Sequence, residues 1–185
     1  MQPETSNRQE QELRRLFFAW WPDAEVQAQL HQLAQVHRPS PHARITRQEK
    51  IHLTLAFLGS VNKEFSDCAV STATALQWQR FTLVFDRLGW FQRARVMWAG
   101  CSHPDSNMSG LVDALSVALQ TCGFQPERRQ FQPHLTLARK VNRPPNTMEI
   151  EPIVCPVDRF SLVESILDSD GAHYRILEQF EATDH

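Results

Sequence analysis

A five-residue segment, His-Leu-Thr-Leu-Ala, occurs twice in the chain and constrains the fold more than any other feature. The two copies are His52–Ala56 and His134–Ala138. In an extended strand, alternate side chains point to the same side. Each copy therefore presents a His and a Thr on one face and two Leu on the other. Because the Leu face is apolar, we expect each copy to be a strand whose Leu side packs in a core.

The repeat is informative because the two copies are identical. The chain contains eight His, so a single His-x-Thr triplet arises readily from composition and is a weak motif. A repeated pentamer indicates an internal duplication. The alternative is that two Leu-rich strands with alternating polar residues coincide. If a pseudo-two-fold axis relates the copies, the two His-x-Thr faces meet across one central cleft.

Hydrophobic periodicity predicts an α+β fold. Helix signals include a capping residue at Asp23, with the helix ending near His37, and a C-terminal glycine at Gly123. A turn is expected near Gly89, and the Pro-rich segment 144–156 reads as a long loop. Further helices are expected around residues 65–76 and 111–119, strands at 14–21, 50–59, 80–88, 95–100, 131–140, 159–167 and 173–180, and a hairpin turn at 168–171.

The order of these elements predicts a bilobal, duplicated domain. We expect two antiparallel-type sheets with flanking helices, and an active site in the cleft between the lobes. The domain is predicted to span residues 13–185, with lobes at roughly 13–90 and 91–185. Residues 1–12 are polar and lack periodicity, which is typical of a disordered tail.

Charge and cysteine content restrict the class of protein. The formal net charge is −2, which argues against binding to long duplex nucleic acid but leaves room for a local basic site. The four cysteines are far apart and form no CxxC pair, so we expect free thiols in a reducing cytosol. They are Cys68, Cys101, Cys122 and Cys155. No signal peptide or membrane-spanning run of ~20 apolar residues is evident, and we expect a cytoplasmic monomer.

Two imidazoles and two hydroxyls facing each other suit phosphoryl chemistry. The ordinary pKa of His is about 6.5, so one ring can accept a proton while the other donates one. Thr hydroxyls can donate to the two non-bridging oxygens of a phosphate. No HExxH motif or acidic cluster adjoins either copy, so neither a metal nor a cofactor is expected. Such chemistry favours an activated ester, for example a 2′,3′-cyclic phosphate, which requires a 2′-OH and hence RNA.

Several segments beyond the repeat strengthen this interpretation. They are RLFFA at 15–19, HLTLAFLG at 52–59, RVMWAG at 95–100 and FQPHLTLAR at 131–139. Together with the paired HxTx motifs, they resemble the 2H phosphoesterase superfamily and, within it, the LigT-like RNA 2′,3′-cyclic phosphodiesterase or 2′-5′ RNA ligase family. The resemblance implies a bilobal fold and metal-independent hydrolysis of RNA 2′,3′-cyclic phosphate ends to 2′-phosphate ends. It also implies reversible 2′-5′ RNA ligation.

The resemblance also implies roles for individual residues. His52 is the expected proton donor to the leaving 3′ oxygen, and His134 is the expected acceptor that activates water. Thr54 and Thr136 are expected to hold the phosphate oxygens. The symmetry of the two motifs does not by itself distinguish donor from acceptor. Arg139 is a further candidate for substrate binding, although strict strand alternation places it on the Leu face, where it would be an ordinary solvated arginine.

Other residues and other functions remain open at this level. Arg93 and Arg95 precede a strand, where contact with RNA phosphates is one interpretation and an ordinary solvated edge is the favoured one. The same superfamily includes possible activity on 2′-5′ oligonucleotides or on small cyclic-phosphate metabolites. A different class is a non-catalytic module that binds RNA ends, and another is a duplicated scaffold with no shared site. Core packing is favoured over base stacking for most of the aromatic residues Phe17, Phe18, Trp90, Phe91 and Phe131.

Overall fold

The computed structural model describes residues 12–126, 131–145, 148–169 and 171–183. The predicted tail lies almost wholly outside these residues, as does Asp170 in the predicted hairpin turn. In chain order the elements are β1 (Arg14–Trp20), α1 (Ala24–Val36), β2 (Arg44–Ile45), the 3-10 turn η1 (Gln48–Lys50), β3 (Leu53–Val61), α2 (Lys63–Thr74), β4 (Phe81–Phe91), β5 (Val96–Gly100), α3 (Ser106–Leu119), the 3-10 turn η2 (Gln120–Cys122), β6 (His134–Arg139), β7 (Glu149–Val157), β8 (Arg159–Asp168) and β9 (Gly171–Glu181).

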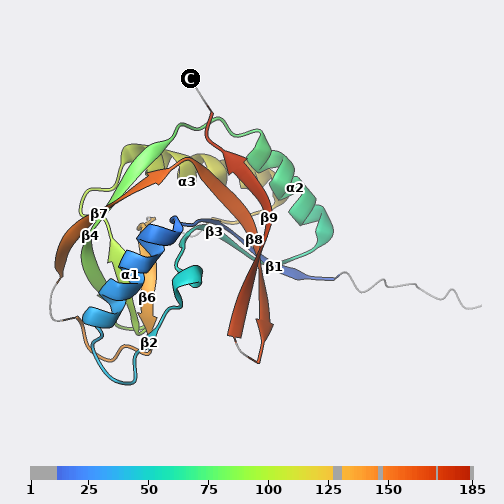
Figure 1. Ribbon diagram of the computed structural model, residues 1–185. Coiled ribbons are helices and arrows are strands. Elements are labelled where there is room, and N and C mark those ends of the chain that lie inside the picture. The colour runs from blue at the N-terminus through green and yellow to red at the C-terminus, as the bar shows by residue number, and fades with distance from the viewer. Residues whose placement is uncertain (1–11, 127–130, 146–147, 170, 184–185) are drawn as a thin grey trace, which may run out of the picture.

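The strands form two antiparallel sheets, which confirms the predicted fold class (Figure 1). Sheet A has the order β3-β1-β8-β9, and sheet B has the order β2-β6-β5-β4-β7. One copy of the repeat therefore lies in each sheet. The sheets do not follow the expected division of the chain near residue 90. The early strands β2 and β4 belong to sheet B, while the last two strands complete sheet A.

The apolar sides of the repeated strands share one core, as the alternation predicts. Leu53, Leu135 and Leu137 are fully buried, and Leu55 is nearly so. They belong to a single cluster that includes residues of all three helices. Helix α1 packs against β2 and β6 of sheet B, whereas α2 and α3 contact each other and the strands of sheet A (Figure 1). In the described part of the chain, no helix is long and apolar enough to cross a membrane.

The predicted helix ends are confirmed. The Asp23 carboxylate accepts a hydrogen bond from the Val26 amide at 2.8 Å and so caps α1. The turn η2, which follows α3, ends at Gly123, whose φ of 90° lies in the left-handed region that favours glycine. Asp23 therefore marks the start of α1, and Gly123 marks the end of the helical segment formed by α3 and η2.

Two segments that were predicted to interrupt the sheets are strands. The expected loop at 144–156 contains β7, which tolerates Pro152 and Pro156 because it is an edge strand with one unpaired side. The expected turn near Gly89 lies inside β4. A Cβ atom at Gly89 would come within 2.0 Å of the Trp98 indole, so the glycine serves close packing between β4 and β5.

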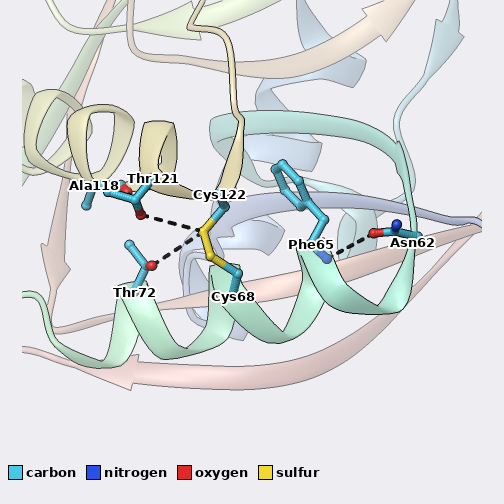
Figure 2. The surroundings of a disulfide bond; sticks show 7 residues. All are labelled: Asn62, Phe65, Cys68, Thr72, Ala118, Thr121 and Cys122. Carbon is cyan, nitrogen blue, oxygen red and sulfur yellow. Dashed lines mark hydrogen bonds between the residues drawn. A yellow bond between two sulfur atoms is a disulfide. The ribbon is translucent and has the colours of Figure 1, made fainter.

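The prediction of four free thiols is wrong for two of them. Cys68 on α2 forms a disulfide with Cys122 in η2, and their Cα atoms are 5.8 Å apart (Figure 2). The two residues are 54 positions apart and meet only because α2 and α3 pack together. Cys101 and Cys155 are free. Burial raises the pKa of Cys101 to about 11 and that of Cys155 to about 12, so both thiols stay protonated at neutral pH.

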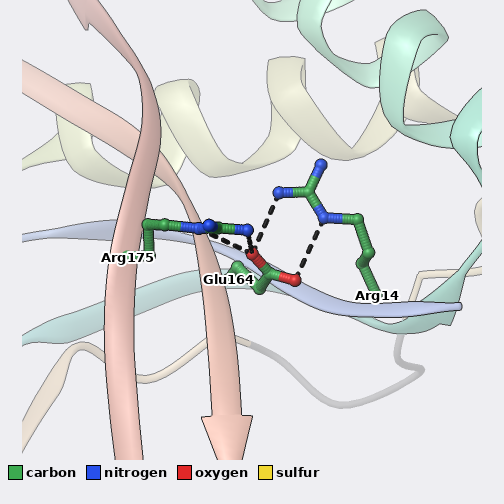
Figure 3. A network of polar contacts seen from close by, with 3 residues as sticks. All are labelled: Arg14, Glu164 and Arg175. Atoms are coloured by element: carbon green, nitrogen blue, oxygen red, sulfur yellow. Dashed lines mark hydrogen bonds and ion pairs between the residues drawn. The ribbon is translucent and has the colours of Figure 1, made fainter. Parts of the chain in front are cut away.

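A buried carboxylate ties together three strands of sheet A. Glu164 on β8 accepts two hydrogen bonds from Arg14 on β1, at 3.0 and 2.9 Å, and two from Arg175 on β9, at 3.0 and 2.6 Å (Figure 3). The Arg14 hydrogen bonds lower the pKa of Glu164 to about 2, despite the opposing effect of burial. The Glu164 carboxylate is therefore ionised in the folded protein at neutral and mildly acidic pH.

Reduction of the Cys68–Cys122 bond should lower the melting temperature. A crosslink that closes a loop of this length stabilises a fold by up to about 4 kcal/mol through the entropy of the unfolded chain. Thermal unfolding should shift with dithiothreitol in the wild type but not in a Cys68→Ser/Cys122→Ser variant, and Cys101→Ser should retain the shift. An identical transition with and without reductant would show that the bond does not form.

Substitution Glu164→Gln should destabilise the fold by about 1–3 kcal/mol at pH 7, because two arginines lose their charged acceptor. Since folding depresses the pKa of Glu164, its contribution is present above pH ~4.5 and is lost as the pH falls towards about 2. The decrease in unfolding free energy caused by Glu164→Gln should therefore be smaller when it is measured by urea unfolding at pH 3. Glu178→Gln, an exposed change on neighbouring β9, is the control and should alter stability by less than ~0.5 kcal/mol. Equal effects of the two substitutions would contradict this role.

Candidate active site

The two repeated strands face one cleft of about 780 Å³. His52 and Thr54 line it from the segment that contains β3 of sheet A, and His134 and Thr136 line it from β6 of sheet B. A second hollow, of about 370 Å³, lies beside the N-terminal half of α3 and has no charged side chain or His in its described lining. The convergence expected from the duplication is therefore present, and the chemistry-bearing residues gather in the larger cleft.

The two imidazole rings are held in the same way. The Nδ1 atom of His52 lies 2.8 Å from the Lys50 carbonyl oxygen, and Nδ1 of His134 lies 2.8 Å from the Gln132 carbonyl oxygen. A carbonyl oxygen can only accept, so Nδ1 carries the hydrogen in both rings. Nε2 is then the unprotonated nitrogen of each neutral ring, available to accept a proton from a ligand.

The surroundings of His52 are strongly apolar. Its ring stacks on Trp21 at a centroid distance of 4.7 Å, and the edges or faces of Tyr174 and Phe17 lie 5.0 and 5.3 Å away. Burial lowers the pKa of His52 to about 4, and the positive charges of Arg139 and His134 contribute in the same direction. The His52 ring is therefore neutral at pH 7 in the free protein.

His134 has a more open setting. Phe91 meets its ring edge-on at 5.1 Å, and Trp98 lies farther away at 6.4 Å. Only these two aromatic contacts are made within the described residues, against three at His52. Two histidines in identical pentamers therefore occupy different environments.

Both repeated strands contain a bulge at the same position. In sheet A the pairing steps from Phe18–Ala56 to Ala19–Thr54, and Leu55 is left without a partner. In sheet B the partner of β5 steps in the same way from Ala138 to Thr136. A bulge inserts one residue and reverses the alternation beyond it. Leu and Ala at the end of each pentamer are consequently both buried.

This bulge places Arg139 in the cleft. Strict alternation would have directed Arg139 to the Leu face, but the inserted residue turns it to the same side as Thr136, where it is exposed and lines the cleft. Phe57 occupies the equivalent position after the first pentamer. It also lines the cleft and is 47% exposed, with the Arg15 guanidinium 5.0 Å from its ring centroid.

The cleft is much more basic than the chain as a whole. Seven of the 19 Lys and Arg of the chain line it, and none of the 21 Asp and Glu belongs to its described lining. From the sequence, Arg139 was a binding candidate, and for Arg95 a solvated edge was favoured over contact with phosphate. The spacing of basic residues every third position in RITRQEK is a signal that could have revealed part of the set. The seven are Arg15, Arg44, Arg47, Lys50, Arg95, Arg139 and Lys140.

The aromatic candidates divide between core and cleft. Phe17 and Phe91 line the cleft, whereas Phe18 is fully buried in the core. Trp21 and Tyr174, which contact His52, were not singled out from the sequence because they lie far from either repeat. In the part of the chain that the structure describes, no group of three or more His, Cys, Asp or Glu is placed to share a metal ion.

Comparison with known proteins identifies the family. The model of the 2'-5' RNA ligase superfamily matches residues 21–168. The chain is 34% identical over 128 residues to the RNA 2',3'-cyclic phosphodiesterase of Escherichia coli (strain K12), covering 69% of this chain and 73% of that protein. It is 28% identical over 153 residues to the protein of the same name from Aeropyrum pernix, covering 75% and 86%.

A solved structure extends this similarity to the whole fold. The crystal structure of E. coli LigT complexed with 3'-AMP superposes with a TM-score of 0.85 at 30% identity, over 94% of this chain and 100% of that one. The family match spans most of the chain and includes both repeated strands. The chain therefore belongs to the 2'-5' RNA ligase superfamily.

Proposed function

We propose that the protein hydrolyses 2′,3′-cyclic phosphate ends of RNA to 2′-phosphate ends without a metal ion, and that it also joins such ends to a 5′-OH in a reversible 2′-5′ ligation, in which the 5′ oxygen takes the place of water. The observation that carries this proposal is the pair of imidazoles, each with the same nitrogen available, on opposite sides of one basic cleft. The activity named for the relatives from E. coli and Aeropyrum pernix supports the choice of substrate.

The proposed reaction is an in-line displacement at phosphorus. His134 accepts a proton from water as the water oxygen bonds to phosphorus, and His52 donates a proton to the 3′ oxygen as its bond to phosphorus breaks. The hydroxyls of Thr54 and Thr136 donate hydrogen bonds to the two non-bridging oxygens. Arg139 balances the negative charge that builds up on them. The product retains phosphate on the 2′ oxygen.

The donor role requires His52 to gain a proton in the complex. In the free protein its ring is neutral at pH 7, because its apolar surroundings and nearby positive charges lower its pKa. An anionic phosphate beside the ring acts in the opposite direction and stabilises the charged form. Substrate binding is thus the step that prepares His52 as an acid.

We further propose that one chain is the working unit, a single bilobal domain of residues 13–185 acting as a monomer in the cytoplasm. Every residue in the proposed reaction comes from a single chain, which supports the monomer. An RNA substrate supports a cytoplasmic site of action. If light scattering showed a dimer, and if the protein lost activity when it was diluted to the monomer, the proposal of a working monomer would be wrong.

The proposed activity should persist in EDTA and depend on both histidines. An oligonucleotide with a 2′,3′-cyclic phosphate end should yield a 2′-phosphate product, identified by chromatography against 2′- and 3′-phosphate standards. His52→Ala and His134→Ala should each lower kcat about 10²–10⁴-fold, because each removes one proton-transfer group. His103→Ala, an exposed change outside the cleft, is the control. A 3′-phosphate product, or tight binding without turnover, would refute the proposal.

The proton state of His52 should change on binding. In an NMR titration of the free protein, the His52 ring should titrate at a pKa of about 4. A bound 2′-phosphorylated nucleoside should raise this pKa, and Trp21→Leu should raise it in the free protein by opening the ring to water. A complex in which His52 remains neutral while His134 is charged would exchange the donor and acceptor roles.

A further inference from the structure

The basic lining of the cleft exceeds what one reacting phosphate requires. A cyclic phosphodiester carries a single negative charge, and the proposed reaction already assigns it two His, two Thr and Arg139. Six further Lys and Arg line the same cleft. Charge that the reacting phosphate does not use is available for other anionic groups of the same ligand.

Four of these cations form a row with Arg139 across sheet B. Arg44 on β2 lies directly opposite Arg139 on β6, and Val96 on β5 lies opposite it on the other side. Adjacent strands are about 5 Å apart, so Arg44 and Arg139 are near neighbours. Lys140 and Arg95 continue the row, since each adjoins a residue of the Arg139–Val96 pair.

Backbone hydrogen bonds hold both ends of this row. The Val141 amide donates to the Arg95 carbonyl at 2.9 Å, which joins the segments that carry Arg95 and Lys140. At the other end, the Thr46 amide donates to the Leu137 carbonyl at 2.9 Å, which brings Arg47 alongside β6 towards Thr136. The row thus runs from the reacting centre to the rim of the cleft.

The row is unfavourable for the protein alone. Like charges directly opposite each other on paired strands are destabilising, and none of the five cations forms an ion pair with a described residue. Arg95 and Lys140 also have φ values of 56° and 59°, in the left-handed region that non-glycine residues rarely adopt. Strain and repulsion that persist together at one place point to a ligand that relieves them.

We propose that the four members of this row other than Arg139, which are Arg44, Arg47, Arg95 and Lys140, bind backbone phosphates of the nucleotides that precede the cyclic end. The preferred substrate is then an oligonucleotide of several residues rather than a cyclic mononucleotide. This inference rests on the proposed function and specifies its substrate. A nucleoside polyphosphate carries similar negative charges. Salt dependence and inhibition by ATP distinguish it from an oligonucleotide.

The salt dependence of the reaction separates these possibilities. For single-stranded nucleic acid, each neutralised phosphate contributes about −0.7 to the slope of log affinity against log salt. With three upstream contacts in addition to the reacting phosphate, kcat/KM for a cyclic-ended oligonucleotide should fall about 50-fold between 50 and 200 mM salt. The fall for 2′,3′-cyclic AMP should be about threefold. The oligonucleotide should also have the higher kcat/KM at low salt.

Matched variants locate the effect in the row. Arg44→Gln/Arg47→Gln and Arg95→Gln should each lower the ratio of oligonucleotide to mononucleotide kcat/KM and flatten the oligonucleotide salt slope. Arg93→Gln removes the same charge from the same turn, but Arg93 does not line the cleft, so the ratio should be retained. Equal ratios in all variants, or equal kcat/KM for both substrates, would overturn the proposal.

Two further readouts keep the inference separate from the proposed function. Hydrolysis of 2′,3′-cyclic AMP tests the reaction alone. If neither substrate is turned over, fluorescence anisotropy of a labelled oligonucleotide still tests the row, through weaker binding by Arg44→Gln/Arg47→Gln than by Arg93→Gln. Strong inhibition of 2′,3′-cyclic AMP hydrolysis by ATP, together with a kcat/KM for the oligonucleotide no higher than that for 2′,3′-cyclic AMP, would assign the row to a polyphosphate. That result would overturn the proposal.

Discussion

Burial of four leucines in one core fixes the geometry on which the rest of the structure depends. Leu53 and Leu55 come from sheet A, and Leu135 and Leu137 come from sheet B. Each buried Leu side chain contributes about 1.5–3 kcal/mol, and a slip of one residue would expose it and bury the histidine instead. The hydrophobic effect therefore selects the register, and the register directs both His-x-Thr faces into the cleft.

Identical sequence does not give the two histidines identical chemistry. Their backbone carbonyl partners match, because each carbonyl belongs to the residue two positions before its histidine. Their aromatic neighbours differ, because Trp21 and Tyr174 come from segments outside the repeat. The equivalent carbonyl contacts thus set the same tautomer in both rings, while the neighbouring aromatic side chains give the two rings different environments.

The features that were predictable from the sequence are those that local periodicity encodes. The strand alternation of the pentamers, the Asp23 cap and the Gly123 terminus all depend on residues within a few positions of each other. The bulge within each pentamer leaves no local signal, because its cause is the pairing with β1 and β5. The same holds for the disulfide, which depends on packing between α2 and α3. The basic residues of the cleft come from distant segments, so the net charge of the chain does not reveal them.

The charge of the cleft links substrate binding to the state of His52. Arg139 attracts an anion and also lowers the pKa of the neighbouring His52 ring. While the cleft is empty, positive charge and apolar surroundings both favour the neutral ring. An anionic phosphate would cancel the effect of the positive charge. It would also displace water from beside the His52 ring, so that its attraction to the charged ring acts in a less polar medium. In the proposed reaction, the cations that attract the substrate thus keep the His52 ring neutral until the substrate supplies the compensating charge.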